Sequence, residues 1–187
     1  MKKLLTAFLF GLLASGCGSP QPAATVNSSS ATSGLKAIGD APDFDVEKIA
    51  GGMLNSSELK GKVVIVDFWA TWCVPCIQEI PNYNKLNEEM ADKDVRILGM
   101  TFQSGDIDEV KPKVAEFGMK YPVAMGNDKV EEGFGGYLGL PTTFVIGKDW
   151  KIYKKYLGMT SNKKAALEKD IAALLEQTPG VTKSTER

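Results

Sequence analysis

A buried strand followed at once by a Cys-x-x-Cys pair limits most strongly what this chain can fold into. Residues 63–68 form a β-branched and aromatic run, which is typical of a short strand buried on both faces. Residues 69–72 follow as a tight turn. Cys73 then opens a helix in which Pro75 stands in the first turn, where proline is tolerated. The segment therefore predicts a strand, a turn and a thiol pair at a helix N-terminus.

The position of the pair predicts its reactivity. The first amides of a helix lack intrahelical acceptors and carry partial positive charge, so a thiolate at Cys73 is stabilised. Cys76 lies one helical turn further on, close enough to form a disulfide. We expect Cys73 to be the exposed attacking sulfur and Cys76 the more buried resolving sulfur. A purely structural disulfide is the alternative, but a bridge that closes so short a loop contributes little stability.

The residues around the pair resemble thioredoxin. The run Val-Asp-Phe-Trp-Ala-Thr-Trp-Cys-Val-Pro-Cys, residues 66–76, is similar to that family almost position for position, and Pro81 follows the second cysteine by five residues. Further segments are similar to the membrane-tethered TlpA/ResA branch; these are residues 39–44, 57–62, 121–123 and 140–146. The resemblance covers residues 38–175 approximately and is more specific than a Cys-x-x-Cys pair alone.

The resemblance implies an α/β protein with a thioredoxin fold. We expect a central mixed β-sheet flanked by helices, with an N-terminal β-hairpin over residues 43–55 and a central α/β insertion before Pro141. Apolar patterning predicts strands at residues 63–68, 95–102, 121–125, 142–146 and 151–156. Helices are expected at residues 73–91, 106–117 and 130–137, and Ser161 is expected to cap a final helix.

The N-terminus predicts export. Lys2 and Lys3 precede an apolar run, residues 4–13, that is too short to span a bilayer as a helix. The following residues up to Cys17 resemble a bacterial lipobox, although Ala14 stands where leucine is commoner. A plain secretory signal with an unmodified Cys17 is the alternative. Lipidation of Cys17 would remove the odd thiol and leave Cys73 and Cys76 as the redox pair.

These features predict four parts of the chain: a lipoprotein signal peptide (1–16), a lipid-attachment cysteine with a flexible linker (17–34), a thioredoxin-like domain (35–177) and a polar tail (178–187). We expect the protein in the bacterial cell envelope, on the periplasmic or extracytoplasmic face, anchored to the membrane by lipid. The balance of 22 Lys and Arg against 23 Asp and Glu argues against a nucleic-acid partner. A monomer is expected.

Two acidic residues are candidates for the chemistry. Asp67 lies inside the buried strand, where an unpartnered carboxylate is costly and desolvation raises its pKa. The resemblance to thioredoxin implies that Asp67 accepts and returns the proton of Cys76 through water; a structural acid bonded to backbone is the alternative. Glu79 fits the Cys-x-x-Glu-x-Pro pattern of the TlpA/ResA branch, which implies that it tunes the thiol pKa values. A solvated helix acid is the alternative.

Pro141 matches the proline that thioredoxins hold in cis beside the disulfide. Its missing N–H would leave Leu140 free to pair with an extended substrate strand, and its ring would hinder a metal from bridging the sulfurs. Thr142 and Thr143 are expected to be ordinary strand residues. The expected substrate contacts are Trp72, Val74, Pro75 and Leu140.

The absence of histidine narrows the function further. It excludes a Cys–His nucleophile pair, a His-ligated metal centre and haem attachment through Cys-x-x-Cys-His. We expect no metal, and no cofactor beyond the redox-active disulfide Cys73–Cys76. Val74 and Pro75 add no cation to the loop between the cysteines, so a reducing couple is expected.

The resemblance implies a thiol–disulfide oxidoreductase that reduces protein disulfides, such as those of apocytochrome c or copper-site proteins. A membrane thiol electron donor would restore the dithiol. One alternative is a thioredoxin-fold peroxidase, although residues 70–72 do not supply the threonine and proline spacing that a peroxidatic cysteine needs. A non-enzymatic copper or zinc carrier is the other, although two thiols without histidine make a poor closed zinc site.

Overall fold

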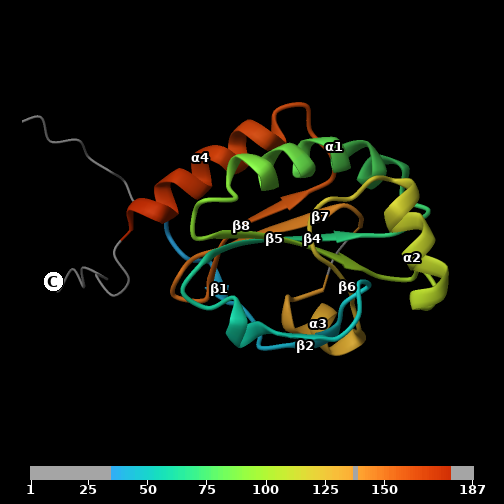
Figure 1. Ribbon diagram of the computed structural model, residues 1–187. Helices are drawn as coiled ribbons and strands as arrows, with labels where there is room; N and C mark the ends of the chain where they lie inside the picture. Colours follow the sequence, from blue (N-terminus) through green and yellow to red (C-terminus); the bar gives the residue numbers. More distant parts are fainter. Residues whose placement is uncertain (1–34, 137–138, 178–187) are drawn as a thin grey trace, which may run out of the picture. The chain divides into compact units, whose positions relative to one another are not determined.

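The part of the chain that the structure describes, residues 35–136 and 139–177 of a computed structural model, is built around a mixed six-stranded sheet (Figure 1). The strand order is β1-β8-β7-β4-β5-β6. The bounds are β1 (Gly39–Asp40), β4 (Val63–Trp69), β5 (Val95–Thr101), β6 (Val123–Met125), β7 (Thr142–Ile146) and β8 (Lys151–Leu157). Central β4 pairs in parallel with β5 and antiparallel with β7, which confirms the expected mixed sheet. The expected signal peptide, Cys17, linker and polar tail lie outside the described residues.

The central strand is buried along its whole length because both faces of the sheet are covered. All seven residues of β4 are buried. Val63 and Ile65 pack under the helices α1 (Val74–Glu89) and α4 (Lys163–Glu176), which run side by side over one face (Figure 1). Val64 and Phe68 pack on the other face, where α3 (Asp128–Gly133) and the N-terminal hairpin lie. The continuous apolar run of β4 follows from this sandwich.

The N-terminal hairpin is confirmed. Strands β2 (Asp45–Glu47) and β3 (Met53–Asn55) pair antiparallel, and Val46 turns into the core. Gly51 and Gly52 make the turn with φ values of 99° and 77°, a left-handed conformation that favours glycine. A single 3₁₀ turn, η1 (Ser56–Glu58), then leads towards β4.

The segment between β5 and β7 folds as α2 (Ile107–Glu116), β6 and α3, which gives the expected α/β insertion. The expected extent of the third helix, 130–137, was wrong. Helix α3 begins at Asp128 and ends at Gly133, because Gly135 and Gly136 adopt φ values of 77° and 69° that a right-handed helix does not allow.

The expected cap of the final helix was also wrong. Asn162 is the N-cap of α4, it makes no side-chain capping bond, and the helix begins at Lys163. Helix α1 agrees with its prediction within two residues and continues through Pro81.

Gly126→Ala should lower the free energy of unfolding by about 1–3 kcal/mol, the usual cost of overpacking a well-packed core. A Cβ at Gly126 would lie 2.3 Å from the ring of Phe102, which is 5% exposed and packs tilted against Phe68 at 4.6 Å between centroids. Urea unfolding measures the loss. Gly39→Ala is the matched control, because a Cβ there meets nothing within 4 Å. Equal losses in the two variants would contradict the packing account.

Candidate active site

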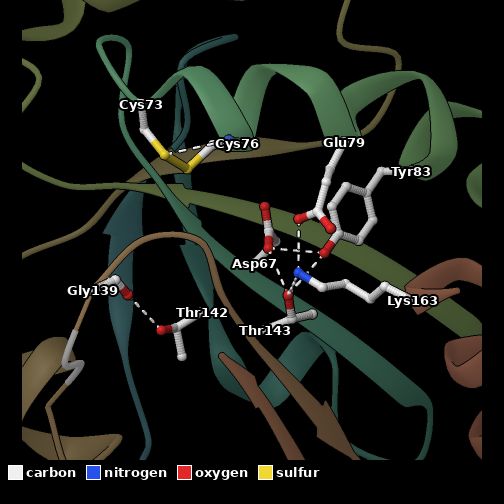
Figure 2. A network of polar contacts seen from close by, with 9 residues as sticks. All are labelled: Asp67, Cys73, Cys76, Glu79, Tyr83, Gly139, Thr142, Thr143 and Lys163. Atoms are coloured by element: carbon white, nitrogen blue, oxygen red, sulfur yellow. Dashed lines mark hydrogen bonds and ion pairs between the residues drawn. A yellow bond between two sulfur atoms is a disulfide. The ribbon is translucent and has the colours of Figure 1, made fainter. Parts of the chain in front are cut away.

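The cysteine pair lies at the start of α1, directly after the turn that follows β4. Cys73 and Cys76 form a disulfide with Cα atoms 5.3 Å apart (Figure 2). Cys73 is the N-cap of α1, and its Sγ accepts a hydrogen bond from the backbone N–H of Cys76 at 3.3 Å. The sulfur of Cys73 therefore occupies the position at which helix amides stabilise negative charge.

The expectation that Cys73 is exposed was wrong for this oxidised state. Cys73 is 4% exposed and Cys76 is 2% exposed. Both pack in an apolar cluster with Trp69 and Val110, so the chain folds over the sulfurs more closely than a helix start alone suggests. Access of a client to Cys73 is therefore confined to a narrow part of the surface.

The four residues expected to contact a substrate are mostly apolar, and they differ in exposure. Trp72 is 60% exposed and Val74 is 62% exposed, whereas Pro75 is half-buried. The Leu140–Pro141 peptide is cis, as the resemblance to thioredoxin implies, and half-buried Leu140 packs against the cluster that contains both cysteines. The four expected substrate-contacting residues therefore carry little polarity and present two large exposed apolar groups.

The loop that follows β5 anchors the active-site turn. The indole Nε1 of Trp72 donates to the carbonyl of Gln103 at 2.8 Å, and the backbone N–H of Thr71 donates to Oγ of Ser104 at 3.0 Å. Gln103 has a φ of 52°, which is uncommon for a residue other than glycine. The loop after β5 therefore holds the orientation of Trp72 beside Cys73.

Asp67 lies at the centre of a buried polar network on the face of the sheet that α1 and α4 cover (Figure 2). It is 2% exposed, and its Oδ1 accepts hydrogen bonds from Tyr83 and Thr143, each at 2.9 Å. Burial raises the pKa of Asp67 to about 7, although Lys163 and the two hydroxyl donors oppose that shift. A carboxyl group with this pKa can both accept and release a proton near neutral pH.

The network corrects two expectations. The alternative for Asp67 was a bond to backbone, but the partners that hold Oδ1 are side chains. Thr143 was expected to be an ordinary strand residue, yet its Oγ1 contacts Asp67, Tyr83 at 2.8 Å and Lys163 at 3.4 Å. Thr142 makes a local bond, from its Oγ1 to the carbonyl of Gly139 at 2.7 Å (Figure 2).

Glu79 is not a solvated helix acid. It is 3% exposed, and its Oε2 lies 2.7 Å from Nζ of Lys163, which is also 3% exposed. Burial raises the pKa of Glu79, while Lys163 and a backbone hydrogen bond from Thr160 lower it. Burial of an unpaired charge is very costly, so the two groups hold each other in the interior.

Sequence reasoning missed Tyr83, Thr143 and Lys163. Tyr83 follows Glu79 by one helical turn, so the spacing places both on one face of α1. Thr143 stands opposite Asp67 in the β4–β7 pairing, which only the strand register reveals. Lys163 lies 84 residues after Glu79. No sequence signal links them.

Within the residues that the structure describes, no group of three or more His, Cys, Asp or Glu side chains is arranged to hold a metal ion. The same residues contain no helix that is long and apolar enough to cross a membrane.

Comparison with known proteins gives the family. Residues 38–155 match the AhpC/TSA family. The chain is 38% identical over 119 residues to the thiol-disulfide oxidoreductase ResA of Bacillus thuringiensis (strain Al Hakam), an alignment that covers 64% of this chain and 68% of that relative.

Solved structures agree. A thiol:disulfide interchange protein of the thioredoxin family from Chlorobium tepidum TLS superposes with a TM-score of 0.65 at 31% identity, covering 73% of this chain and 95% of that one. The exposed lipoprotein thioredoxin Etrx1 of Streptococcus pneumoniae strain TIGR4 superposes with a TM-score of 0.63 at 26% identity, covering 71% of this chain and all of that one. The chain therefore belongs to the AhpC/TSA family of thioredoxin-like proteins, as a thiol–disulfide oxidoreductase related to ResA.

Proposed function

We propose that this oxidoreductase works as a reductant of protein disulfides in the bacterial cell envelope. The observation that carries the proposal is the pairing of a helix-capping sulfur, Cys73, with a buried proton acceptor, Asp67, whose pKa is about 7. The first group supplies the nucleophile, and the second supplies a place for the proton of the resolving thiol.

The proposed cycle begins with the reduced pair. The Cys73 thiolate attacks a client disulfide, a mixed disulfide forms, and one client sulfur leaves as a thiolate that takes up a proton. Asp67 then accepts the proton of Cys76 through water, and the Cys76 thiolate attacks the sulfur of Cys73. The Cys73–Cys76 bond forms, the bond to the client breaks, and the second client sulfur leaves as a thiolate that takes up a proton. The client gains two electrons and the cysteine pair loses them.

The direction of transfer is inferred from the residues between the cysteines. Val74 and Pro75 bring no positive charge, so the Cys73 thiolate gains its stabilisation from the helix start alone. A modestly stabilised thiolate makes the reduced pair a better electron donor than a strongly stabilised one. A membrane thiol protein would return the dithiol after each cycle.

The clients that we propose have paired cysteines in an extended segment, as in apocytochrome c or a copper-site protein before its cofactor is inserted. The exposed side chains of Trp72 and Val74, together with Leu140, which packs against the cluster that contains both cysteines, offer apolar groups to such a segment. We further propose that residues 1–16 are removed as a signal peptide and that lipid on Cys17 anchors the domain, 35–177, as a monomer to the extracytoplasmic face. Similarity to the lipoprotein Etrx1 supports the anchor.

The test is trapping of clients in bacteria that express the full chain. Cys76→Ala should accumulate adducts that a reducing agent dissolves on a gel, because the mixed disulfide at Cys73 can no longer be resolved. Cys73→Ala is the matched control and should yield few. Mass spectrometry of the adducts identifies the clients. Equal yields from the two variants, or no adducts from either, would contradict the assigned roles.

A further inference from the structure

Lys163 occupies a place that its local sequence does not favour. It is the first residue of α4, a helix that has no side-chain cap and no acidic residue in its first turn. A cation at a helix N-terminus faces the positive end of the helix dipole. Lysine is also rarely buried, yet Lys163 is 3% exposed. Positions that break several local rules at once are commonly functional ones.

The contacts of Lys163 connect it to Asp67, the proposed proton acceptor. Its Nζ donates to Oε2 of Glu79 at 2.7 Å and to Oγ1 of Thr143 at 3.4 Å. Thr143 in turn donates to Oδ1 of Asp67 at 2.9 Å. Figure 2 shows the ammonium group between the Glu79 carboxylate and the Thr143 hydroxyl group. The lysine therefore reaches Asp67 through a single hydroxyl group.

The hydrogen atoms of this network allow Asp67 to exist in either protonation state. The oxygen atoms of Tyr83, Thr143 and Asp67 lie 2.8–2.9 Å apart in a triangle, and the two hydroxyl groups supply two hydrogens for its three contacts. With Asp67 ionised, both hydroxyls donate to Oδ1. With a proton on Oδ1, that hydrogen and the two hydroxyl hydrogens are enough to give each of the three oxygen–oxygen contacts one hydrogen bond. Neither state leaves the carboxyl group without a partner, so nearby charge decides between the two.

We propose that Lys163 is a positioning residue for the resolving step: paired with Glu79, it holds a positive charge beside Asp67 and keeps that carboxylate able to accept the Cys76 proton. This inference rests on the proposed function and extends it to a residue on α4. Without the lysine charge, burial would favour the protonated form of Asp67, and Cys76 would lose its proton acceptor at neutral pH.

The groups that face Asp67 determine the direction in which its pKa moves when Lys163 is replaced. Helix α1 presents Tyr83 and Glu79, α4 presents Lys163, and Tyr121 lies on the β6 side; burial and the charge of Asp67 both raise the pKa of Tyr83 and Tyr121. The two phenols therefore stay neutral near pH 7. Lys163 favours the ionised form of Asp67 and Glu79 opposes it, with the lysine the stronger of the two.

The experiment follows the reduced full-length protein with 5,5′-dithiobis(2-nitrobenzoate) in a stopped-flow instrument. The first nitrothiobenzoate is released when Cys73 forms the mixed disulfide, and the second is released when Cys76 resolves it. The rate of the second phase against pH reports the coupled titration of Asp67 and Cys76. Lys163→Met should move its midpoint up by about one pH unit or more, which slows resolution at pH 7 about tenfold.

Glu79→Gln separates a charge effect from loss of structure. Both substitutions break the same buried ion pair, but Glu79→Gln removes a negative charge and should move the midpoint down. Lys164→Met is the control, because the neighbouring lysine pairs with Glu89 and Glu168 at the surface. It should leave the midpoint unchanged. If either single variant does not fold, the double variant Glu79→Gln with Lys163→Met replaces it, because it leaves no unpaired charge. The pH midpoint of its second phase should still lie above that of the wild type, since Lys163 affects Asp67 more strongly than Glu79 does.

The outcomes are distinguishable from a failure of the proposed function. Equal midpoints in all variants, or shifts in the same direction for Lys163→Met and Glu79→Gln, would refute the role of Lys163 while leaving the redox chemistry intact. A wild-type protein that releases no second nitrothiobenzoate would instead contradict the resolving role of Cys76, and with it the proposed function.

Discussion

Asp67→Asn should stabilise the oxidised protein at pH 8 by about 2–4 kcal/mol and change its stability by less than about 1 kcal/mol at pH 4. The folded pKa of Asp67 is about 7, against 3.8 for an ordinary aspartate, because the group is buried. Between these two values the unfolded chain has released the proton and the folded chain has kept it. Stability due to this group therefore falls as the pH rises from 4 to 7, and it levels off above 7. Asparagine does not titrate, so the variant lacks this loss.

Urea unfolding of wild type and variant at several pH values between 4 and 8 measures the difference. Asparagine keeps an oxygen that can accept from Tyr83 and Thr143, so packing is little changed. Asp94→Asn, at an exposed carboxylate, serves as the control and should follow the wild type at every pH. Parallel curves for wild type and Asp67→Asn would show that Asp67 is not perturbed by burial.

The same substitution should slow the second phase of the nitrothiobenzoate assay by about 10²-fold or more at pH 7, because a positioned base is lost. The first phase should change little, since Cys73 relies on the helix start. If Asp67→Asn is more stable but resolves the mixed disulfide more slowly, Asp67 lowers the free energy of unfolding and is needed for the reaction.

Glu79→Gln should destabilise the protein by about 3 kcal/mol, because it leaves the ammonium group of Lys163 buried without its counter-charge. Glu89→Gln is the matched control, since Glu89 joins the same two helices through Lys164 but does so at the surface. Exposed ion pairs contribute little, so this control should unfold at nearly the wild-type urea concentration.

Replacement of both partners completes the comparison. Glu79→Gln with Lys163→Met removes the unpaired charge, so it should recover most of the lost stability. Chemical unfolding at pH 7 gives all the values. A loss in Glu89→Gln as large as that in Glu79→Gln, or a double variant no more stable than Glu79→Gln alone, would argue against a buried ion pair.

Local sequence predicted the parts of the fold that depend on neighbouring residues. The run of apolar residues before Cys73 required a strand covered on both faces, and the proline at residue 75 agreed with a helix start. The hairpin predicted over residues 43–55 is present, with Gly51 and Gly52 in its turn. The predicted cap of the final helix, Ser161, was wrong by one residue: the N-cap is Asn162, which makes no side-chain capping bond.

The sequence by itself determined the chemistry that lies within one segment: a reactive sulfur at the start of a helix, a second sulfur one turn away and an acid in the preceding strand. Only the tertiary structure decided which groups control that acid. Tyr83, Thr143 and Lys163 come from three different elements, and they meet Asp67 because α1 and α4 pack on the same face of the sheet where β7 pairs with β4. The energy of a buried charge depends on its partners in space, and these can be far away in the chain: Glu79 and Lys163, which form the buried ion pair, are 84 residues apart.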